Sequence, residues 1–181
     1  GPAELFLIPA LLKKVKEIDL DREGISVIPI YGVHFDVYAK LFSSNSLPKK
    51  CAIITDGDLK PSDANTDLEG EDDLPPPPDL EALNSKHVQV FACKTTFERA
   101  VTQKGTLNML AHAAEDIGAP TIAKRLRKGS KDLTSEDDSR KILDPLREVV
   151  LNTAKRFGKA RFAQIASRHV DKATSIPKYI V

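Results

Sequence analysis

The feature that most constrains the fold is the run Ala52-Ile53-Ile54-Thr55-Asp56-Gly57-Asp58, in which β-branched residues give way to two carboxylates around one glycine. Such an apolar run is typical of a buried strand in a parallel sheet. Open α/β sheets bind ligands at the carboxyl ends of their strands. Hard divalent cations such as Mg²⁺ or Mn²⁺ are the natural partners of paired carboxylates. The run therefore favours an α/β fold with a ligand site over a purely structural scaffold.

Composition excludes several classes of protein. The chain has 181 residues, of which 41% are hydrophobic and 29% charged, as in an ordinary globular domain. It has no apolar run long enough to cross a membrane and no visible secretory signal. Cys51 and Cys93 lack Cys-x-x-Cys spacing, so we expect buried free thiols in a reducing compartment. We therefore expect a cytoplasmic protein without a membrane partner.

Charge is distributed unevenly along the chain, although its net value is only +1. Between Asp56 and Glu81 there are ten acidic residues and one lysine. An acidic centre with basic flanks suits a metal site that must hold a polyanion, although each charge run can equally be a solvated face. The basic residues gather later, at Lys124, Arg125, Arg127, Lys128, Lys131, Lys155, Arg156, Lys159, Arg161 and Arg168.

The first half of the chain has the pattern of an α/β domain. Pro2 and Glu4 suit the first turn of a helix, and apolar residues then recur at helical spacing to Val15. A strand is expected at residues 25–30, a helix at 35–42, and further strands at 51–56 and 88–93. This order predicts a parallel sheet with flanking helices. A doubly wound domain begins with a strand, so we expect that first strand to precede residue 1.

The second half is expected to be helical. An acidic, proline-containing loop occupies residues 59–84, and a long helical region follows Thr95 and Thr96, which can cap it. We expect a short helix from Pro120 to about residue 126, a polar loop at 128–135, helices to residues 157 and 169, and an extended tail. The expected organisation is an α/β core at 1–98, a helical subdomain at 99–158, and a C-terminal helix and tail at 159–181 that return to the core.

Six positions, taken in order, resemble the pattern of a known family. They are Glu4, Gly32, Asp56, Asp58, Glu98 and Lys159. Gly1-x-x-Glu4, a glycine at position 32 and Asp56-x-Asp58 resemble the Toprim domain, a Rossmann-like fold shared by topoisomerases, primases and nucleases. The segments Thr96-Phe97-Glu98 and Gly158-Lys159-x-Arg161-Phe162-Ala163 look like the C-terminal nuclease region of the overcoming-lysogenisation-defect (OLD) family. The resemblance covers nearly the whole chain.

The resemblance implies the nuclease part of a bacterial or phage endonuclease whose full-length form carries an N-terminal ABC-type ATPase. The present sequence has no P-loop. The implied partners are DNA and that ATPase domain. The sequence leaves the oligomeric state open, although cutting both strands of DNA would favour a homodimer. The resemblance also assigns Lys159 to transition-state stabilisation.

Hydrolysis of a phosphodiester by two Mg²⁺ or Mn²⁺ ions needs carboxylates that arrive from several elements. Asp56 and Asp58 leave one strand, Glu98 follows the next, and Glu4 lies in the first helical turn. We expect all four to meet at the carboxyl edge of a parallel sheet. The structural alternatives are turn formation or capping for the two aspartates, and complementation of a helix dipole for the two glutamates.

The basic candidates have structural alternatives too. Lys159 begins a helix, where a cation is unfavourable, and this suggests a nearby anion. It can otherwise be a solvated surface lysine. Lys155 and Arg161 are candidate contacts to backbone phosphates.

Two functions other than an endonuclease fit the same sequence. A receiver-like signalling module also places acids at strand ends and accepts phosphate on an aspartate, here Asp56. A DNA-binding or dimerisation module without catalysis would keep the acids as remnants. Metal titration would distinguish the module without catalysis from the endonuclease and the receiver-like module. Labelling of Asp56 by an acyl-phosphate donor would identify the receiver-like module.

Overall fold

The computed structural model describes the whole chain except residues 33, 58–77, 134–138 and 181. The described residues form two compact units, each with its own fold. The sheet unit comprises the described residues of Ile30–Phe97, with Gly1 and the C-terminal Lys178–Ile180. The helical unit comprises Pro2–Pro29 and the described residues of Glu98–Pro177.

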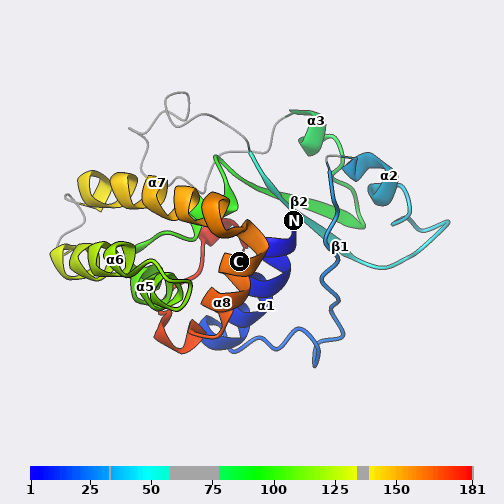
Figure 1. The fold of residues 1–181 in the computed structure, drawn as a ribbon. Helices are drawn as coiled ribbons and strands as arrows, with labels where there is room; N and C mark the ends of the chain where they lie inside the picture. Colours follow the sequence, from blue (N-terminus) through cyan, green and yellow to red (C-terminus); the bar gives the residue numbers. More distant parts are fainter. Residues whose placement is uncertain (33, 58–77, 134–138, 181) are drawn as a thin grey trace. The chain divides into compact units, whose positions relative to one another are not determined.

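The elements follow one another in an order that keeps strands in the first half of the chain (Figure 1). They are α1 (Pro2–Val15), α2 (Phe35–Ala39), β1 (Cys51–Asp56), α3 (Pro78–Glu81), β2 (Val88–Cys93), α4 (Phe97–Ala100), η1 (Lys104–Thr106), α5 (Leu107–Asp116), α6 (Pro120–Asp132), α7 (Ser139–Phe157), α8 (Lys159–Ser167), η2 (Val170–Lys172) and η3 (Lys178–Ile180).

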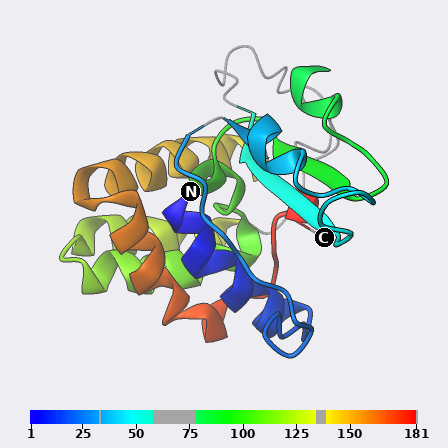
Figure 2. The ribbon, with the colours of Figure 1, turned by 90° about the vertical axis from the view of Figure 1, so that its right-hand side faces the viewer.

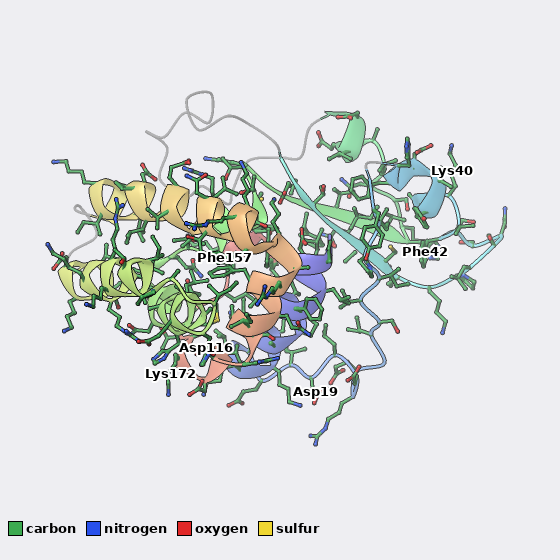
Figure 3. The ribbon with its side chains drawn as sticks, in the orientation of Figure 1. Asp19, Lys40, Phe42, Asp116, Phe157 and Lys172 are labelled. Carbon is green, nitrogen blue, oxygen red and sulfur yellow. The ribbon has the colours of Figure 1, made fainter. Side chains whose placement is uncertain are left out.

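The sheet unit is built on β1 and β2, which pair in parallel with Cys51 opposite Val88 and Asp56 opposite Cys93. Both strands coincide with the predicted ranges, and their parallel pairing confirms the predicted α/β class. Side chains alternate across a sheet, so one face carries a small apolar cluster. That cluster joins Ile53, Val88 and Val90 to Ala39 of α2, with the side chains of Phe35, Phe42, Cys51, Leu80 and Leu83 packed around it. Phe42 is labelled in Figure 3.

The helical unit has a larger core. Its fully buried side chains come from four helices, and α8 adds three more buried residues. The apolar spacing of α1, with Leu7, Ile8, Leu11 and Leu12 buried, gives the single stripe expected of an amphipathic helix. The fully buried set includes Leu11, Leu107, Met109, Leu110, Leu126 and Val150.

One predicted strand is wrong. Residues 25–30 form no strand in the described part of the chain, and Ile25 and Ile28 are 51% and 72% exposed. The apolar pattern favours extended backbone, but a strand also needs a partner for its main-chain groups. Pro29 has no N–H to donate. A tendency of residues 25–30 toward extended backbone was therefore not sufficient to form a paired strand.

Several boundaries also differ from the prediction. Helix α2 ends at Ala39 and not near residue 42, and α3 forms at Pro78–Glu81 within the range predicted as a loop. Helix α6 continues to Asp132, through part of the expected polar loop, because Leu126 and Gly129 keep the buried spacing. Helix α8 ends at Ser167, and a 3₁₀ turn at η2 follows. A second 3₁₀ turn, η3, replaces part of the extended tail. The division at residues 98 and 158 stays a prediction. Within the described part of the chain, no helix combines the length and apolarity needed to span a membrane.

Candidate functional site

Asp56 ends β1 at the carboxyl edge of the parallel pair. Its Oδ1 atom accepts a hydrogen bond of 2.7 Å from the main-chain N–H of Phe97, the first residue of α4. This bond fixes one oxygen of the carboxylate and supplies an acceptor to an N–H group that has no partner within its own helix. Asp56 therefore caps α4, which is the structural alternative considered for the aspartates, although Phe97 lies 41 positions away in the chain. A carboxylate held by the main chain is a preorganised acceptor for a cation.

Position 57, next to Asp56, has no room for a side chain, so only glycine fits there. A Cβ atom at this position would lie 2.1 Å from the carbonyl oxygen of Cys93 and 2.7 Å from that of Lys94. Backbone atoms cannot retreat from such a contact at low cost. The glycine therefore lets the end of β1 run against the segment that follows β2.

Cys93 lies directly opposite Asp56 in the register and is 3% exposed. Its thiol donates toward Asp56 Oδ1 at 3.7 Å and toward the carbonyl oxygen of Thr95 at 3.6 Å. Burial, followed by the charge of Asp56, raises the pKa of the Cys93 thiol to about 12, and hydrogen bonds from Gly57 and Tyr179 of η3 partly offset this rise. Cys93 is therefore a neutral donor beside the carboxylate and not a nucleophile.

Glu98 and Lys159 form an ion pair inside the helical unit. The Lys159 ammonium donates to Glu98 Oε2 at 3.0 Å across 61 residues of sequence. The Glu98 side chain is 7% exposed and that of Lys159 is 42% exposed. A buried carboxylate requires such a partner. Glu98 is therefore one anion beside Lys159.

Glu4 belongs to the same unit as this pair. It occupies the first turn of α1, and Lys159 is the first residue of α8. Helices α1 and α8 pack against each other and begin at the same end of their pair, as both views show (Figures 1 and 2). The fold of the helical unit thus brings the beginnings of the two helices that carry Glu4 and Lys159 to one end.

A second layer of charges lies next to Glu98, and the sequence reading missed it. Arg99 is 6% exposed and pairs with Glu148 of α7. Arg147 pairs with Asp144 at 3.0 Å, and its Nε atom donates to the carbonyl oxygen of Thr102 at 3.4 Å. The signal for Arg99 was its position directly after Glu98. Its partner could not be inferred, because Glu148 is 49 residues away in the chain.

The predicted site residues fall into three groups. Lys159 and Glu98 are in contact, whereas Asp56 occupies the sheet unit and Glu4 begins α1. Asp58 lies outside the described residues. Two predicted phosphate contacts, Lys155 and Arg161, are exposed. Among the described residues, no group of three or more His, Cys, Asp and Glu side chains is arranged to hold a metal ion.

Comparison with known proteins shows which family the first part of the chain resembles. Residues 1–58 match the family described as overcoming lysogenization defect protein-like, TOPRIM domain. The first 58 residues are therefore similar to the OLD-like Toprim family. The match ends on the Asp56-Gly57-Asp58 motif, which confirms the resemblance found in the sequence.

Solved structures of OLD proteins agree over nearly the whole chain. The C-terminal region of the Burkholderia pseudomallei OLD protein is 26% identical, with a TM-score of 0.65, and the match covers 99% of this chain and 89% of that one. The C-terminal region of the Xanthomonas campestris pv. campestris OLD protein has 23% identity and a TM-score of 0.61, with 99% and 86% covered. No curated protein gives a significant sequence match. The fold of this chain is that of an OLD C-terminal region, and Toprim domains of this family are generally metal-binding domains of the nuclease type.

Proposed function

We propose that this OLD-type chain is a metal-dependent DNA endonuclease that hydrolyses phosphodiester bonds with two Mg²⁺ or Mn²⁺ ions. The observation that carries the proposal is the position of Asp56, a carboxylate anchored by a main-chain N–H at the carboxyl end of a parallel strand. This is the edge at which α/β sheets bind ligands. Carboxylate oxygens are the donors that hard divalent cations prefer.

In this proposal Glu4, Asp56, Asp58 and Glu98 supply carboxylate oxygens to the metal ions. The metal ions, when bound, supply Lewis-acid activation of the phosphate and of the attacking water. Lys159 has an exposed ammonium beside the buried Glu98. It is suited to stabilise the additional negative charge that develops on the phosphoryl oxygens in the transition state. Lys155 and Arg161 would contact neighbouring phosphates of the DNA backbone.

The proposal also places the chain in a larger assembly. The structures it matches are described as C-terminal regions of OLD proteins. We propose that this chain is likewise the C-terminal part of an ATPase-nuclease with an N-terminal ABC-type ATPase domain. Cleavage of both DNA strands would then suit a homodimer, with one site for each strand.

Cleavage of supercoiled plasmid tests the activity. The purified chain is incubated with Mg²⁺, Mn²⁺ or Ca²⁺, beside Asp56→Asn and Lys159→Met. An asparagine oxygen can still accept the bond from Phe97, so Asp56→Asn removes the charge and keeps the fold. We expect metal-dependent nicking or linearisation that falls at least about 100-fold in both variants, as for loss of one preorganised electrostatic group.

Matched controls remove charge elsewhere. Asp36→Asn removes an exposed carboxylate that pairs with Lys40 on the surface of the sheet unit, and Lys14→Met removes an exposed lysine of α1. Both should cleave like the parent. Loss of cleavage in these controls to the same degree would contradict a site-specific role. Labelling of Asp56 by an acyl-phosphate donor, with no cleavage, would replace the proposal with the receiver-like function.

A further inference from the structure

Helix α6 concentrates positive charge on one surface. It carries five basic residues, at positions 124, 125, 127, 128 and 131, against a single acid, Asp132. Its buried residues, Ala123, Leu126 and Gly129, recur every three positions and form the stripe that packs into the helical unit. The charges therefore gather on the opposite side of the helix.

The contact with α7 fixes how α6 is rotated. A Cβ atom at Gly129 would lie 2.4 Å from Leu146 Cδ1, so the two helices approach closely where Gly129 has no side chain. Gly129 therefore faces α7, and the buried stripe as a whole faces the interior of the helical unit, where α6 packs against α5 and α7. Lys124, Arg125, Lys128 and Lys131 consequently point outward and are exposed. These four residues are called the α6 basic face below.

The fifth basic residue of α6, Arg127, is not part of this face because its charge is paired. Arg127 forms an ion pair with Glu115 of α5. In the described part of the chain, no such ion pair is recorded for the four residues of the α6 basic face. Like charges three or four residues apart on a helix repel each other. Lys124 and Lys128 are such a pair, and so are Lys128 and Lys131. A polyanion that lies along the helix would attract all four cations and so offset this repulsion.

We propose that the α6 basic face binds the sugar–phosphate backbone of duplex DNA, as an additional docking surface beside the residues that act on the scissile bond. The inference rests on the proposed function, because that function supplies a long polyanionic substrate. Lys124 to Lys131 spans about 10 Å of helix at 1.5 Å per residue. One strand of B-DNA presents a phosphate about every 3.4 Å along its axis. The face therefore matches about three successive phosphates.

The chemistry of the face favours DNA over a lipid surface. The exposed residues of α6 are Pro120, Thr121, Asp132 and the four cations, and none of them is a large aromatic or aliphatic side chain. A helix that lies on a bilayer inserts Trp, Phe or Leu side chains from the face opposite its basic residues. In α6 that opposite face is already buried within the helical unit, where α6 packs against α5 and α7. Figure 3 shows nitrogen-tipped side chains extending from α6 at the edge of the helical unit.

The test compares two variants of equal charge. In the first, Lys124, Arg125, Lys128 and Lys131 are all changed to Gln. In the second, four exposed lysines elsewhere are changed to Gln, namely Lys14, Lys16, Lys49 and Lys86. Binding of a fluorescent duplex of about 30 base pairs is followed by anisotropy from 50 to 200 mM salt, with EDTA to prevent cleavage. Each lost phosphate contact lowers the slope of log K against log salt by about 0.9.

We expect the first variant to bind at least about 30-fold more weakly at 50 mM salt, with a salt slope lower by about 3. The second should stay within about threefold of the parent. Equal weakening of both variants would overturn the inference, since net charge alone would then explain the effect. Unchanged binding by the first variant would also overturn it. Circular dichroism checks that both variants fold.

Two further measurements separate this inference from the proposed function. Asp36→Asn should bind the duplex like the parent whether or not the chain cleaves DNA. Duplex binding that depends on the α6 basic face, without metal-dependent cleavage by the parent, supports the docking surface and contradicts the nuclease. Cleavage by the parent, with duplex binding that ignores the face, does the reverse. If the first variant loses binding to phosphatidylserine vesicles but not to DNA, a lipid surface replaces DNA as the partner.

Discussion

Asp56 in the sheet unit accepts its hydrogen bond from a main-chain N–H, whereas Glu98 in the helical unit accepts one from the ammonium of Lys159. The main-chain donor is present with any residue except proline at position 97, so this hydrogen bond of Asp56 depends mainly on the sheet and its following turn. The environment of Glu98 depends on one side chain. Asp56 is therefore sensitive to changes in backbone geometry, whereas Glu98 is sensitive to the loss of its charged partner.

The units also differ in how they are stabilised. The helical unit buries large side chains from four helices, whereas the apolar cluster of the sheet unit has Ile53, Val88 and Val90 on the strands and Ala39 on α2. Larger buried apolar area contributes more free energy of folding. We infer that the sheet unit opens more easily than the helical unit.

The largest effect is expected from a cavity in the helical unit. Leu110 is 0% exposed, and Leu110→Ala should lower the free energy of unfolding by about 3–5 kcal/mol. Ile53→Ala in the smaller cluster should cost about 2–3 kcal/mol, because its surroundings relax more readily. Hydrogen exchange resolves the two units. If Ile53→Ala also exposes the amides of α5 to the same extent, the units unfold together and the comparison fails.

A steric change in the sheet unit should rank second. Gly57→Ala places a methyl group against the carbonyl oxygens of Cys93 and Lys94. The clash should cost about 1–3 kcal/mol and accelerate exchange at the Phe97 amide. The control is Gly118→Asn in the helical unit, where φ is +86° and nothing lies within 4 Å of a Cβ atom. Asparagine tolerates this conformation, so the control should cost less. A larger loss in the control would contradict the close-approach argument.

The ion pair of the helical unit should rank third. Lys159→Met leaves the carboxylate of Glu98 buried without its cation. We expect a loss of about 1–2 kcal/mol in denaturant unfolding, less than for a fully buried pair because Lys159 is partly solvated. Glu98→Gln in the same background should restore part of that loss, since the buried charge is gone. Additive effects of the two substitutions would mean that the pair does not contribute to stability.

The smallest effect at neutral pH concerns the two thiols. Burial raises the pKa of Cys51 as well, but Cys51 is only half-buried, whereas Cys93 is buried. Iodoacetamide at pH 8 should therefore modify Cys51 first and Cys93 only when the sheet unit opens. Equal rates of modification at the two thiols would show that the sheet end around Asp56 is open.

The same thiol gives a pH dependence with a definite sign. The pKa of Cys93 rises from 9.0 to about 12 on folding, so the folded state retains a proton that the unfolded state loses. Stability from this group is complete below pH 9 and declines as the pH rises toward 12. Cys93→Ala should flatten thermal stability across this window. A parent protein with no decline there would contradict the role of Cys93 as a buried neutral donor.

Local sequence was sufficient where the pattern and the packing agree. Residues 51–56 and 88–93 were predicted as strands and are β1 and β2 with the same limits. It failed at residues 25–30, where an extended tendency found no pairing partner among the described residues, and at residues 128–132, where tertiary packing of Gly129 against Leu146 prolonged α6. Main-chain pairing and close helix approach depend on residues far along the chain.

The candidate site shows the same division. The sequence by itself determined that acids follow two strands, that Lys159 is placed where a helix begins, and that Gly57 separates two carboxylates, because residue type and spacing are local properties. It suggested, but did not determine, an anion near Lys159. Only the tertiary structure decided that Glu98 is that anion, that the Phe97 amide holds Asp56, and that Cys93 lies opposite Asp56 as a neutral thiol. These partners are 61, 41 and 37 residues apart in the chain. Such contacts form only when the elements pack, since no local periodicity encodes which distant side chains will meet.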